Sequence, residues 1–407
     1  MVLKRTLRKD GAGGTLDLQY DNMTTFADRA KDRNNHFNLI RFVAAFVVLA
    51  AHSAIFVGVW PFWDPYAHGY DLATGGMAVD AFFVISGFLV TGSLLSRQSL
   101  STFVWARFLR IFPGLWVMLL LTVFGLGLAL TTLPAEEFLA SPVTHEYLWR
   151  CATLVNGIRK YLPGVFETNR LDTAFNGSLW TLPIEWRMYE FLAIAWVLLA
   201  IIPKYRLIAF RLLAPVAAVV GLLYVGIDVI THERANLGSM HSYMFFAGSA
   251  ILVLGDKIPV SFKIVPILLA VLAVSLLHYK LALLVYLVVM PFLVLNLAYA
   301  PGRLLLRFNR FGDYSYGVYI YAYPIQQTVH SFWPDLSPGG LTALASAPTL
   351  VMAMLSWRFV EKPALAHREA FASATRGLID RLRRQPTLET AKDDGPGVFA
   401  QEQSHLR

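Results

Sequence analysis

Apolar residues gather in long runs that short polar segments separate. We distinguish ten such runs, at residues 37–58, 76–96, 106–131, 178–202, 208–230, 239–255, 264–278, 281–299, 312–332 and 341–360. Nearly all of them reach the roughly 17–25 residues that an α-helix needs to cross a bilayer. The pattern therefore predicts an all-α, polytopic integral membrane protein with about ten transmembrane helices.

The distribution of basic residues favours one orientation in the membrane. With the N-terminus in the cytoplasm, 28 of the 35 lysines and arginines lie on the cytoplasmic side, six lie on the opposite side, and Arg187 lies within a span. Cytoplasmic loops usually carry such an excess. We therefore expect both termini in the cytoplasm, with an N-terminal segment at 1–36, a transmembrane domain at 37–363 that includes an extracytoplasmic loop at 132–177, and a disordered polar tail at 364–407.

Composition narrows the class of protein further. The chain is 56% hydrophobic and 15% charged, whereas soluble domains carry about 25% charged residues. The net charge of +8 is spread over loops, so we expect the lipid bilayer, and no nucleic acid, as a partner. The single cysteine, Cys151, excludes an internal disulfide framework and a thiolate metal cluster. We expect no metal.

Two ionisable residues share one face of the first predicted span. Arg41 and His52 are eleven residues apart, which places them within roughly 20° around a helix and about 16 Å apart along it. Ionisable groups inside spans are costly and usually mark a site. This face therefore carries a cation near the cytoplasm and an imidazole toward the outside.

Two carboxylates are predicted to lie at the depth of His52. Counted from the expected outer boundary, His52 is about 9 Å deep, Asp80 about 6 Å and Glu185 about 10 Å. Each has an alternative explanation: His52 could bond a neighbouring helix, Asp80 could cap its helix, and Glu185 could pair with Arg187 or clamp two helices. We expect a titratable cluster of His52, Asp80 and Glu185.

A second basic pair occurs at the cytoplasmic start of the third span. Arg107 and Arg110 are three residues apart and so lie on one side of a helix. Such a pair can hold phosphate groups through bidentate contacts. Ordinary anchoring by positive charge at the membrane surface is the alternative.

Five motifs in order resemble those of the membrane-bound acyltransferase family 3, over nearly the whole membrane region. Arg41 and His52 reproduce its Arg-x10-His pattern. Further matches are GMAVDAFFVISGFL (76–89), RFLRIFP (107–113), SLWTLPIEWRMY (178–189) and SWRFVEKP (356–363). Many members have a histidine where this chain has Ala322, within GDYSYGVYIYAYPIQQ (312–327). That histidine cannot be required here, and Gln326, Gln327 and His330 are candidate neutral donors at the same outer end.

The resemblance implies an integral O-acyltransferase of the bacterial inner membrane. It would move an acyl group, expected to be acetyl, from cytoplasmic acyl-CoA to a hydroxyl of an extracytoplasmic glycan or glycolipid. We expect Arg41, Arg107 and Arg110 to hold the phosphates of acetyl-CoA, the donor substrate. His52 would act as general base, oriented by Glu185 or Asp80. Covalent acylation of His52 is an open alternative.

Two questions stay open at the level of sequence. The oxyanion of the reaction needs hydrogen-bond donors, for which Ser86, Arg187 and Tyr189 are candidates. A proton-coupled transporter is the alternative function, because histidine and carboxylates in a bundle also form proton relays. The absence of paired, Gly/Pro-broken helices in corresponding halves weakens that alternative.

Overall fold

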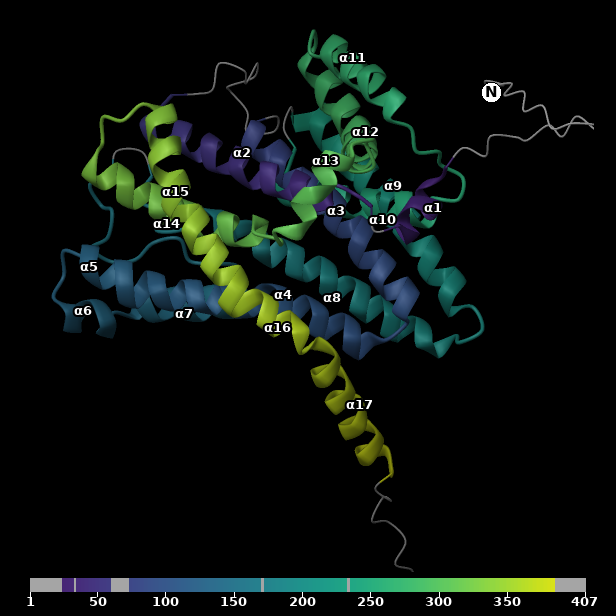
Figure 1. The fold of residues 1–407 in the computed structure, drawn as a ribbon, viewed down its shortest axis with the longest axis horizontal. Helices are drawn as coiled ribbons and strands as arrows, with labels where there is room; N and C mark the ends of the chain where they lie inside the picture. Colours follow the sequence, from purple (N-terminus) through teal and green to yellow (C-terminus); the bar gives the residue numbers. More distant parts are fainter. Residues whose placement is uncertain (1–23, 33, 60–72, 170–171, 233–234, 385–407) are drawn as a thin grey trace, which may run out of the picture.

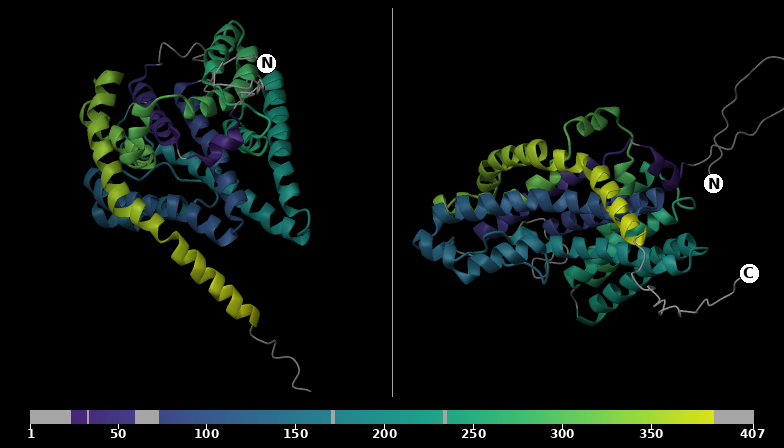
Figure 2. Two further views of the ribbon diagram at one scale, coloured as in Figure 1. Left: turned by 45° about the vertical axis from the view of Figure 1, so that its right-hand side comes forward. Right: turned by 90° about the horizontal axis from the view of Figure 1, so that it is seen from below.

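The computed structural model describes residues 24–32, 34–59, 73–169, 172–232 and 235–384. Within these residues, the secondary structure is helical apart from an isolated bridge between Thr25 and Pro259. Figures 1 and 2 show long helices that run side by side along the long axis of the molecule, with shorter helices at their ends. The all-α prediction is confirmed for the described part of the chain.

The first half of the chain forms the helices α1 to α8. Their bounds are α1 (Phe26–Lys31), α2 (Phe37–Val57), α3 (Thr74–Arg97), α4 (Leu100–Leu120), α5 (Leu128–Leu130), α6 (Ala135–Ala140), α7 (Pro142–Thr153) and α8 (Leu182–Leu198). A π-helical stretch, Leu121–Gly127, joins α4 to α5, and a 3-10 turn, Gly177–Thr181, precedes α8.

The second half forms the helices α9 to α17. Their bounds are α9 (Arg206–His232), α10 (Leu237–Val253), α11 (Val265–Ser275), α12 (Tyr279–Ala298), α13 (Arg303–Leu306), α14 (Ser315–Phe332), α15 (Pro338–Ser356), α16 (Lys362–Ala366) and α17 (Arg368–Arg384). A π-helical turn, Trp357–Glu361, links α15 to α16.

Each of the ten predicted spans corresponds to helical structure. Among the described residues, six helical stretches are long and apolar enough to cross a membrane: Phe37–Val57, Thr74–Arg97, Leu100–Leu130, Arg206–His232, Tyr279–Ala298 and Pro338–Leu382. The apolar helices α10 and α11 are shorter. A multi-pass membrane protein is therefore confirmed, while the count of ten spans and the side on which the termini lie stay predictions.

Two glycines let α3 and α10 pack with their backbones in contact. A Cβ on Gly87 would lie 1.8 Å from the carbonyl oxygen of Phe245, and a Cβ on Gly248 would lie 2.1 Å from the carbonyl oxygen of Val84. Small residues permit such close approach, which is a common way to join helices in membranes. The contact fixes α3, which carries several residues of the site.

The segment before α8 enters the bundle without regular structure. Asn176 is fully buried and Ser178 is 1% exposed. Side chains of α14 satisfy the segment's backbone: the Gln327 amide donates to the carbonyl of Ala174 (2.8 Å), and the Tyr319 hydroxyl donates to that of Ser178 (2.8 Å). Irregular backbone is tolerated at membrane depth where protein surrounds it in this way. Helical structure begins at Gly177, close to the predicted start at Ser178, but protein surrounds these first residues, and the regular α-helix α8 begins at Leu182.

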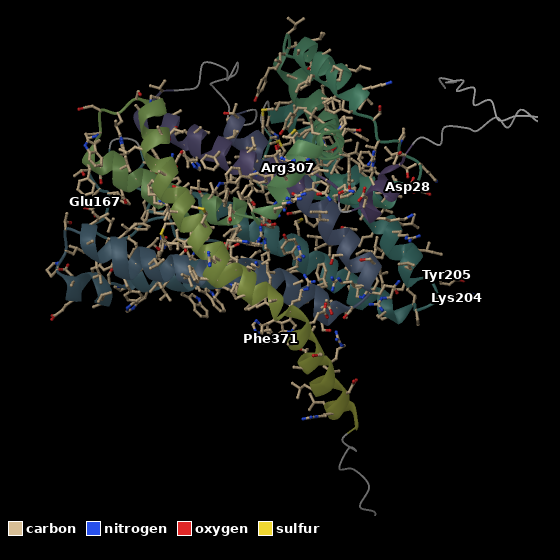
Figure 3. The ribbon with its side chains drawn as sticks, in the orientation of Figure 1. Asp28, Glu167, Lys204, Tyr205, Arg307 and Phe371 are labelled. Carbon is tan, nitrogen blue, oxygen red and sulfur yellow. The ribbon has the colours of Figure 1, made fainter. Side chains whose placement is uncertain are left out.

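The loop at 132–177 contains α6 and α7. Figure 3 shows Glu167 of this loop at one end of the bundle and Lys204, between α8 and α9, at the opposite end. Glu146 of α7 pairs with Arg150 (2.8 Å) and Arg159 (2.5 Å). Hydrogen bonding from Arg159 lowers the pKa of the exposed Glu146 carboxyl below its usual value. The loop is thus a structured cap at that end.

The structure shows helices in both predicted terminal segments and corrects the C-terminal one. Part of the segment 1–36 is folded, since α1 buries Phe26 completely against the core. The predicted disordered tail at 364–407 is wrong for residues 368–384, which form α17. The helix forms because its apolar and charged residues alternate at helical spacing, a pattern that overall polarity conceals. Residues 1–23 and 385–407 lie outside the described part.

Candidate active site

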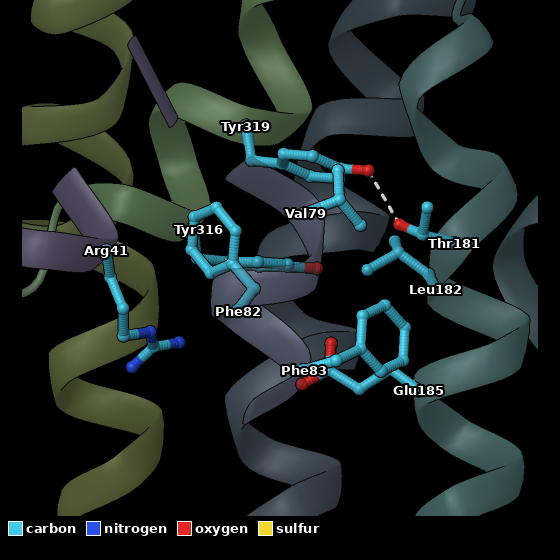
Figure 4. Close-up of a pocket in the computed structure, with 9 residues that line it drawn as sticks. All are labelled: Arg41, Val79, Phe82, Phe83, Thr181, Leu182, Glu185, Tyr316 and Tyr319. Atoms are coloured by element: carbon cyan, nitrogen blue, oxygen red, sulfur yellow. Dashed lines mark hydrogen bonds between the residues drawn. The ribbon is translucent and has the colours of Figure 1, made fainter. Parts of the chain in front are cut away.

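Two adjoining cavities lie between α2, α3, α4, α8 and α14. The first, of about 440 Å³, is mainly apolar, and its lining includes Phe82, Phe83 and Tyr319 (Figure 4). The second, of about 410 Å³, has polar and apolar groups in similar measure and is lined by Arg107 and Arg110 among other residues. Arg41, Glu185 and Tyr316 line both cavities. We call the second the cationic cavity and the first the aromatic cavity.

Asp313 joins two of the predicted donor-binding arginines. Its Oδ2 accepts from Arg41 at 2.8 Å and from Arg110 at 2.6 Å, and its Oδ1 accepts from the Ser315 hydroxyl at 2.5 Å. The side chains of Arg110 and Asp313 are only 12% and 13% exposed. Two of the three arginines are therefore held by a carboxylate that the sequence had not singled out.

A second unpredicted carboxylate, Glu361, reaches the same arginine. It is fully buried, lies 3.5 Å from Arg110, and accepts from the Ser356 hydroxyl at 2.9 Å. The π-helical turn Trp357–Glu361 places it there, and such turns are frequent at functional sites. The signal was present in the sequence, because Glu361 belongs to the closing motif at 356–363.

Arg107 differs from the other two arginines. Among the described residues, no carboxylate oxygen lies within salt-bridge distance of it, whereas Asp313 pairs with both Arg41 and Arg110. Its guanidinium lies 5.8 Å from the centre of the Tyr189 ring. Arg107 is thus the member of the predicted trio whose charge is available to an anion in the cationic cavity.

Glu185 belongs to the cationic cavity. Its Oε1 accepts hydrogen bonds from the hydroxyls of Ser86 (2.9 Å) and Tyr189. Ser86 and Tyr189, two of the predicted oxyanion donors, line the cationic cavity. Their hydroxyl hydrogens are directed at Glu185. Arg187 is exposed and lines neither cavity, because two residues along a helix correspond to about 200° of rotation.

His52 lies farther along α2, beyond the aromatic cavity. The Tyr323 ring meets it edge to face at 5.0 Å between centroids, and its Nδ1 is buried without a hydrogen-bond partner among the described residues. The acidic group that acts on it electrostatically is Asp172. Asp172 accepts a hydrogen bond from the Tyr323 hydroxyl and another from the backbone N–H of Ala174 at 2.8 Å.

The predicted cluster of His52, Asp80 and Glu185 is not assembled. Glu185 lines the cationic cavity together with Arg107, because the first turn of α8 lies inside the bundle. Asp80 is fully buried between three helices, where it contacts His241 Nδ1 of α10 at 2.7 Å and accepts from the Tyr286 hydroxyl of α12 at 2.7 Å. It does not cap α3, which begins at Thr74. Sequence alone gave no reason to pair Asp80 with a histidine 161 positions away.

Gln326 connects α14 to α2 beside His52. It is fully buried, and its amide nitrogen donates to the Leu49 carbonyl at 2.7 Å and to the Ser53 hydroxyl at 2.6 Å. Both amide hydrogens are therefore used within the protein, which leaves only the carbonyl oxygen, unpartnered among the described residues, for a substrate. No group of three His, Cys, Asp or Glu side chains in the described part is arranged to hold a metal ion.

Comparisons with known proteins agree with this architecture. The family model described as an acyltransferase domain, of acyltransferase family 3, matches residues 34–358. An O-acetyl transferase of Shigella phage Sf6 is 32% identical over 343 residues, which cover 81% of this chain and 96% of the phage protein. Nodulation protein 10 of Rhizobium leguminosarum bv. viciae is 29% identical over 173 residues, or 40% of this chain and 44% of that protein.

No solved structure matches the chain. The family match extends from just before α2 to the π-helical turn that carries Glu361, so it includes both cavities and His52. The chain therefore belongs to acyltransferase family 3 and is a multi-pass membrane O-acyltransferase.

Proposed function

We propose that this enzyme transfers an acetyl group from cytoplasmic acetyl-CoA to a hydroxyl of an extracytoplasmic glycan or glycolipid, in the bacterial inner membrane. The observation that carries the proposal is the sequence of features along α2. The cationic cavity and the aromatic cavity share Arg41, and His52 lies eleven residues beyond Arg41 on the same helix. A phosphate-bearing thioester fits this order of cationic, apolar and titratable surroundings.

In this proposal Arg107 is the primary contact for the phosphates of the donor. Phosphate groups pair well with guanidinium, which can form two parallel hydrogen bonds. Arg41 and Arg110, held by Asp313 at 2.8 and 2.6 Å, add positive potential and shape the cavity. The pantetheine arm would then extend through the aromatic cavity toward His52.

His52 is the proposed general base. Imidazole can accept the proton of an acceptor hydroxyl near neutral pH as that oxygen attacks the thioester carbonyl. The C–S bond then breaks, and the proton passes to the departing CoA thiolate, so the reaction balances without a metal. Asp172, held by Tyr323, replaces Glu185 and Asp80 as the proposed carboxylate that orients and charge-stabilises His52.

Tyr319 separates the two ends of this route. Its hydroxyl is 2.6 Å from that of Thr181, a contact drawn in Figure 4, and it closes the aromatic cavity one helical turn before Tyr323. The donor must therefore displace the Tyr319 side chain, or pass beside it, to bring the thioester to His52.

The test uses purified enzyme in nanodiscs with radiolabelled acetyl-CoA. We expect saturable binding of acetyl-CoA and release of CoA that depends on an added glycan or glycolipid acceptor. Mass spectrometry of surface glycans from cells with and without the protein identifies the acceptor. A thermal unfolding measurement establishes that the enzyme is folded. If folded enzyme neither binds nor turns over acetyl-CoA, the donor assignment is overturned.

A further inference from the structure

The C-terminal helix α17 is amphipathic and stands out from the bundle. Figures 1 and 2 show it extending away from the parallel helices. One stripe along it is formed by large apolar side chains at helical spacing, and these are 43%, 58%, 41% and 61% exposed at Phe371, Leu378, Ile379 and Leu382, respectively. The opposite face carries Glu369, Ser373, Arg376 and Asp380. The apolar stripe is therefore largely uncovered by protein.

Only the first half of α17 is attached to the rest of the molecule by the contacts described. Phe371 stacks on Trp105 of α4 at 4.7 Å between ring centroids, and the Trp105 indole donates to the Thr375 hydroxyl at 2.9 Å. Arg376 donates to the hydroxyls of Ser101 and Thr102 at 3.0 and 3.1 Å. Figure 3 shows Phe371 where α17 leaves the bundle.

These contacts determine where α17 lies relative to the membrane. The membrane-crossing stretch Leu100–Leu130 begins next to Ser101 and Thr102, the two residues that Arg376 contacts. Trp105, on which Phe371 stacks, lies in the second turn of the same stretch. A helix attached to its first turns lies at the membrane surface, because that end of the span is where the hydrocarbon core stops. Tryptophan is itself enriched at this level.

The composition of α17 distinguishes it from the lipid-facing helices. The spanning helix α9 is apolar over most of its length, with exposed side chains such as Leu212 (61%) and Leu223 (59%). By contrast, α17 contains five arginines and two acidic residues in 17 positions, which is too many charges for the hydrocarbon core. A charged face opposite an apolar face is typical of helices that lie in the membrane interface.

We propose that α17 is an interfacial helix whose apolar stripe lies among lipid headgroups and upper acyl chains, and whose arginines bind the phosphates of anionic phospholipids. Its net charge of +3 complements a negatively charged membrane surface. Because α17 is attached to α4, which carries Arg107 and Arg110, this anchor holds the cationic cavity at a fixed depth. The proposal does not depend on the identity of the donor or the acceptor.

Spin labels on the full-length protein test the proposal. The single cysteine, Cys151, is replaced by serine, and single cysteines are introduced at Leu378 and Leu382 on the apolar stripe and at Ser373 and Asp380 on the opposite face. The nanodiscs contain about one-third phosphatidylglycerol. We expect the spin labels at Leu378 and Leu382 to be several-fold more accessible to oxygen, as measured by spin relaxation, than to a water-soluble nickel chelate. The labels at Ser373 and Asp380 should show the reverse.

Two reference positions calibrate the measurement. A label at Leu212 reports the hydrocarbon core, and a label at Lys204 reports water. In nanodiscs of phosphatidylcholine alone, the labels at Leu378 and Leu382 should become more accessible to nickel, because the arginines lose their anionic partners.

Three results would overturn the proposal. Equal accessibility of both faces would mean that α17 extends into water. If the accessibility of the labels at Leu378 and Leu382 to nickel did not change with anionic lipid, the arginines of α17 would not bind lipid phosphates. Dipolar coupling between labels at Leu378 on two copies would mean that a second copy of the chain covers the stripe. Unfolding temperature, measured for each labelled protein, identifies any variant that fails to fold.

Discussion

The structure predicts opposite consequences for the substitutions Arg107→Gln and Arg110→Gln, although the two arginines belong to one motif. Arg110 contacts Asp313 at 2.6 Å and Glu361 at 3.5 Å, whereas Arg107 has no carboxylate within salt-bridge distance among the described residues. Arg107→Gln should therefore impair donor binding, and Arg110→Gln should chiefly impair stability.

The magnitudes follow from what each side chain contacts. A hydrogen bond to a charged group contributes about 1.5–3 kcal/mol, so loss of the Arg107–phosphate contact should raise the KM for acetyl-CoA roughly 10- to 150-fold. Removing one partner of a buried ion pair costs about 3–5 kcal/mol, because the other charge is left uncompensated. Among the described residues, Arg110→Gln would leave Asp313 with Arg41 alone and Glu361 with no cation within 4 Å.

The assay combines initial rates over a range of acetyl-CoA concentrations with thermal unfolding, both in nanodiscs. Arg97→Gln is the matched control, because it removes an arginine from the same end of the bundle whose ion pair with Glu369 is 43% and 54% exposed. Such an exposed pair contributes at most about 1 kcal/mol. We expect the control to keep both the KM and the unfolding temperature of the unmodified enzyme.

Either of two patterns of results would refute these assignments of Arg107 and Arg110. If Arg107→Gln lowered the unfolding temperature as much as Arg110→Gln and left the KM unchanged, Arg107 would be a structural residue. If Arg110→Gln raised the KM without loss of stability, the ion pairs with Asp313 and Glu361 would have to give way to the donor.

Substitutions at four further positions test the remaining assignments. His52→Ala should abolish acetyl transfer at unchanged membrane content, and substantial residual turnover per folded molecule would exclude His52 as the base. Asp172→Asn should lower kcat with little change in the KM for acetyl-CoA, with partial recovery in Asp172→Glu; equal loss in both variants would indicate packing. Glu185→Gln should lower the donor KM and change kcat less, because it removes a negative charge from the cavity proposed to bind the donor phosphates, and an unchanged KM with a reduced kcat would return Glu185 to the vicinity of His52. Gly87→Ala should destabilise the protein by at least about 1–3 kcal/mol, since its Cβ would lie 1.8 Å from the Phe245 carbonyl oxygen; an unchanged unfolding temperature would contradict this close packing.

The sequence by itself determined which segments are helical in the membrane. Apolar runs of the right length require helices, because the hydrocarbon core leaves backbone polar groups no other partner. The bounds of α2, α3, α9 and α12 agree with the predicted runs to within two residues at each end. The order of the motifs also sufficed to indicate the acyltransferase family, which the family match confirms. These properties depend on neighbouring positions in the chain, so local pattern is enough.

Part of the site was also predictable from local pattern. Arg41 and His52 share one helix, and Arg107 and Arg110 share another, so their relative positions follow from helix geometry. That Arg41 acts together with Arg107 and Arg110 was expected from the family resemblance, and the cationic cavity contains all three. The partners Asp313 and Glu361 were not expected, since they lie just before α14 and in the π-helical turn after α15, 203 and 251 positions away from Arg110.

Only the tertiary structure decided how deep each polar residue lies. The depth of Glu185 was counted from an assumed boundary at Ser178. Hydrogen bonds from α14 to this segment instead hold it within the bundle. Glu185 consequently lines the cationic cavity together with Arg107, and Tyr323, whose ring packs against His52, donates a hydrogen bond to Asp172. Asp80, at the correct end of α3, instead faces His241 and Tyr286. A sequence pattern gives the angle of a side chain around its own helix, but which helix faces that side chain depends on how all the helices pack.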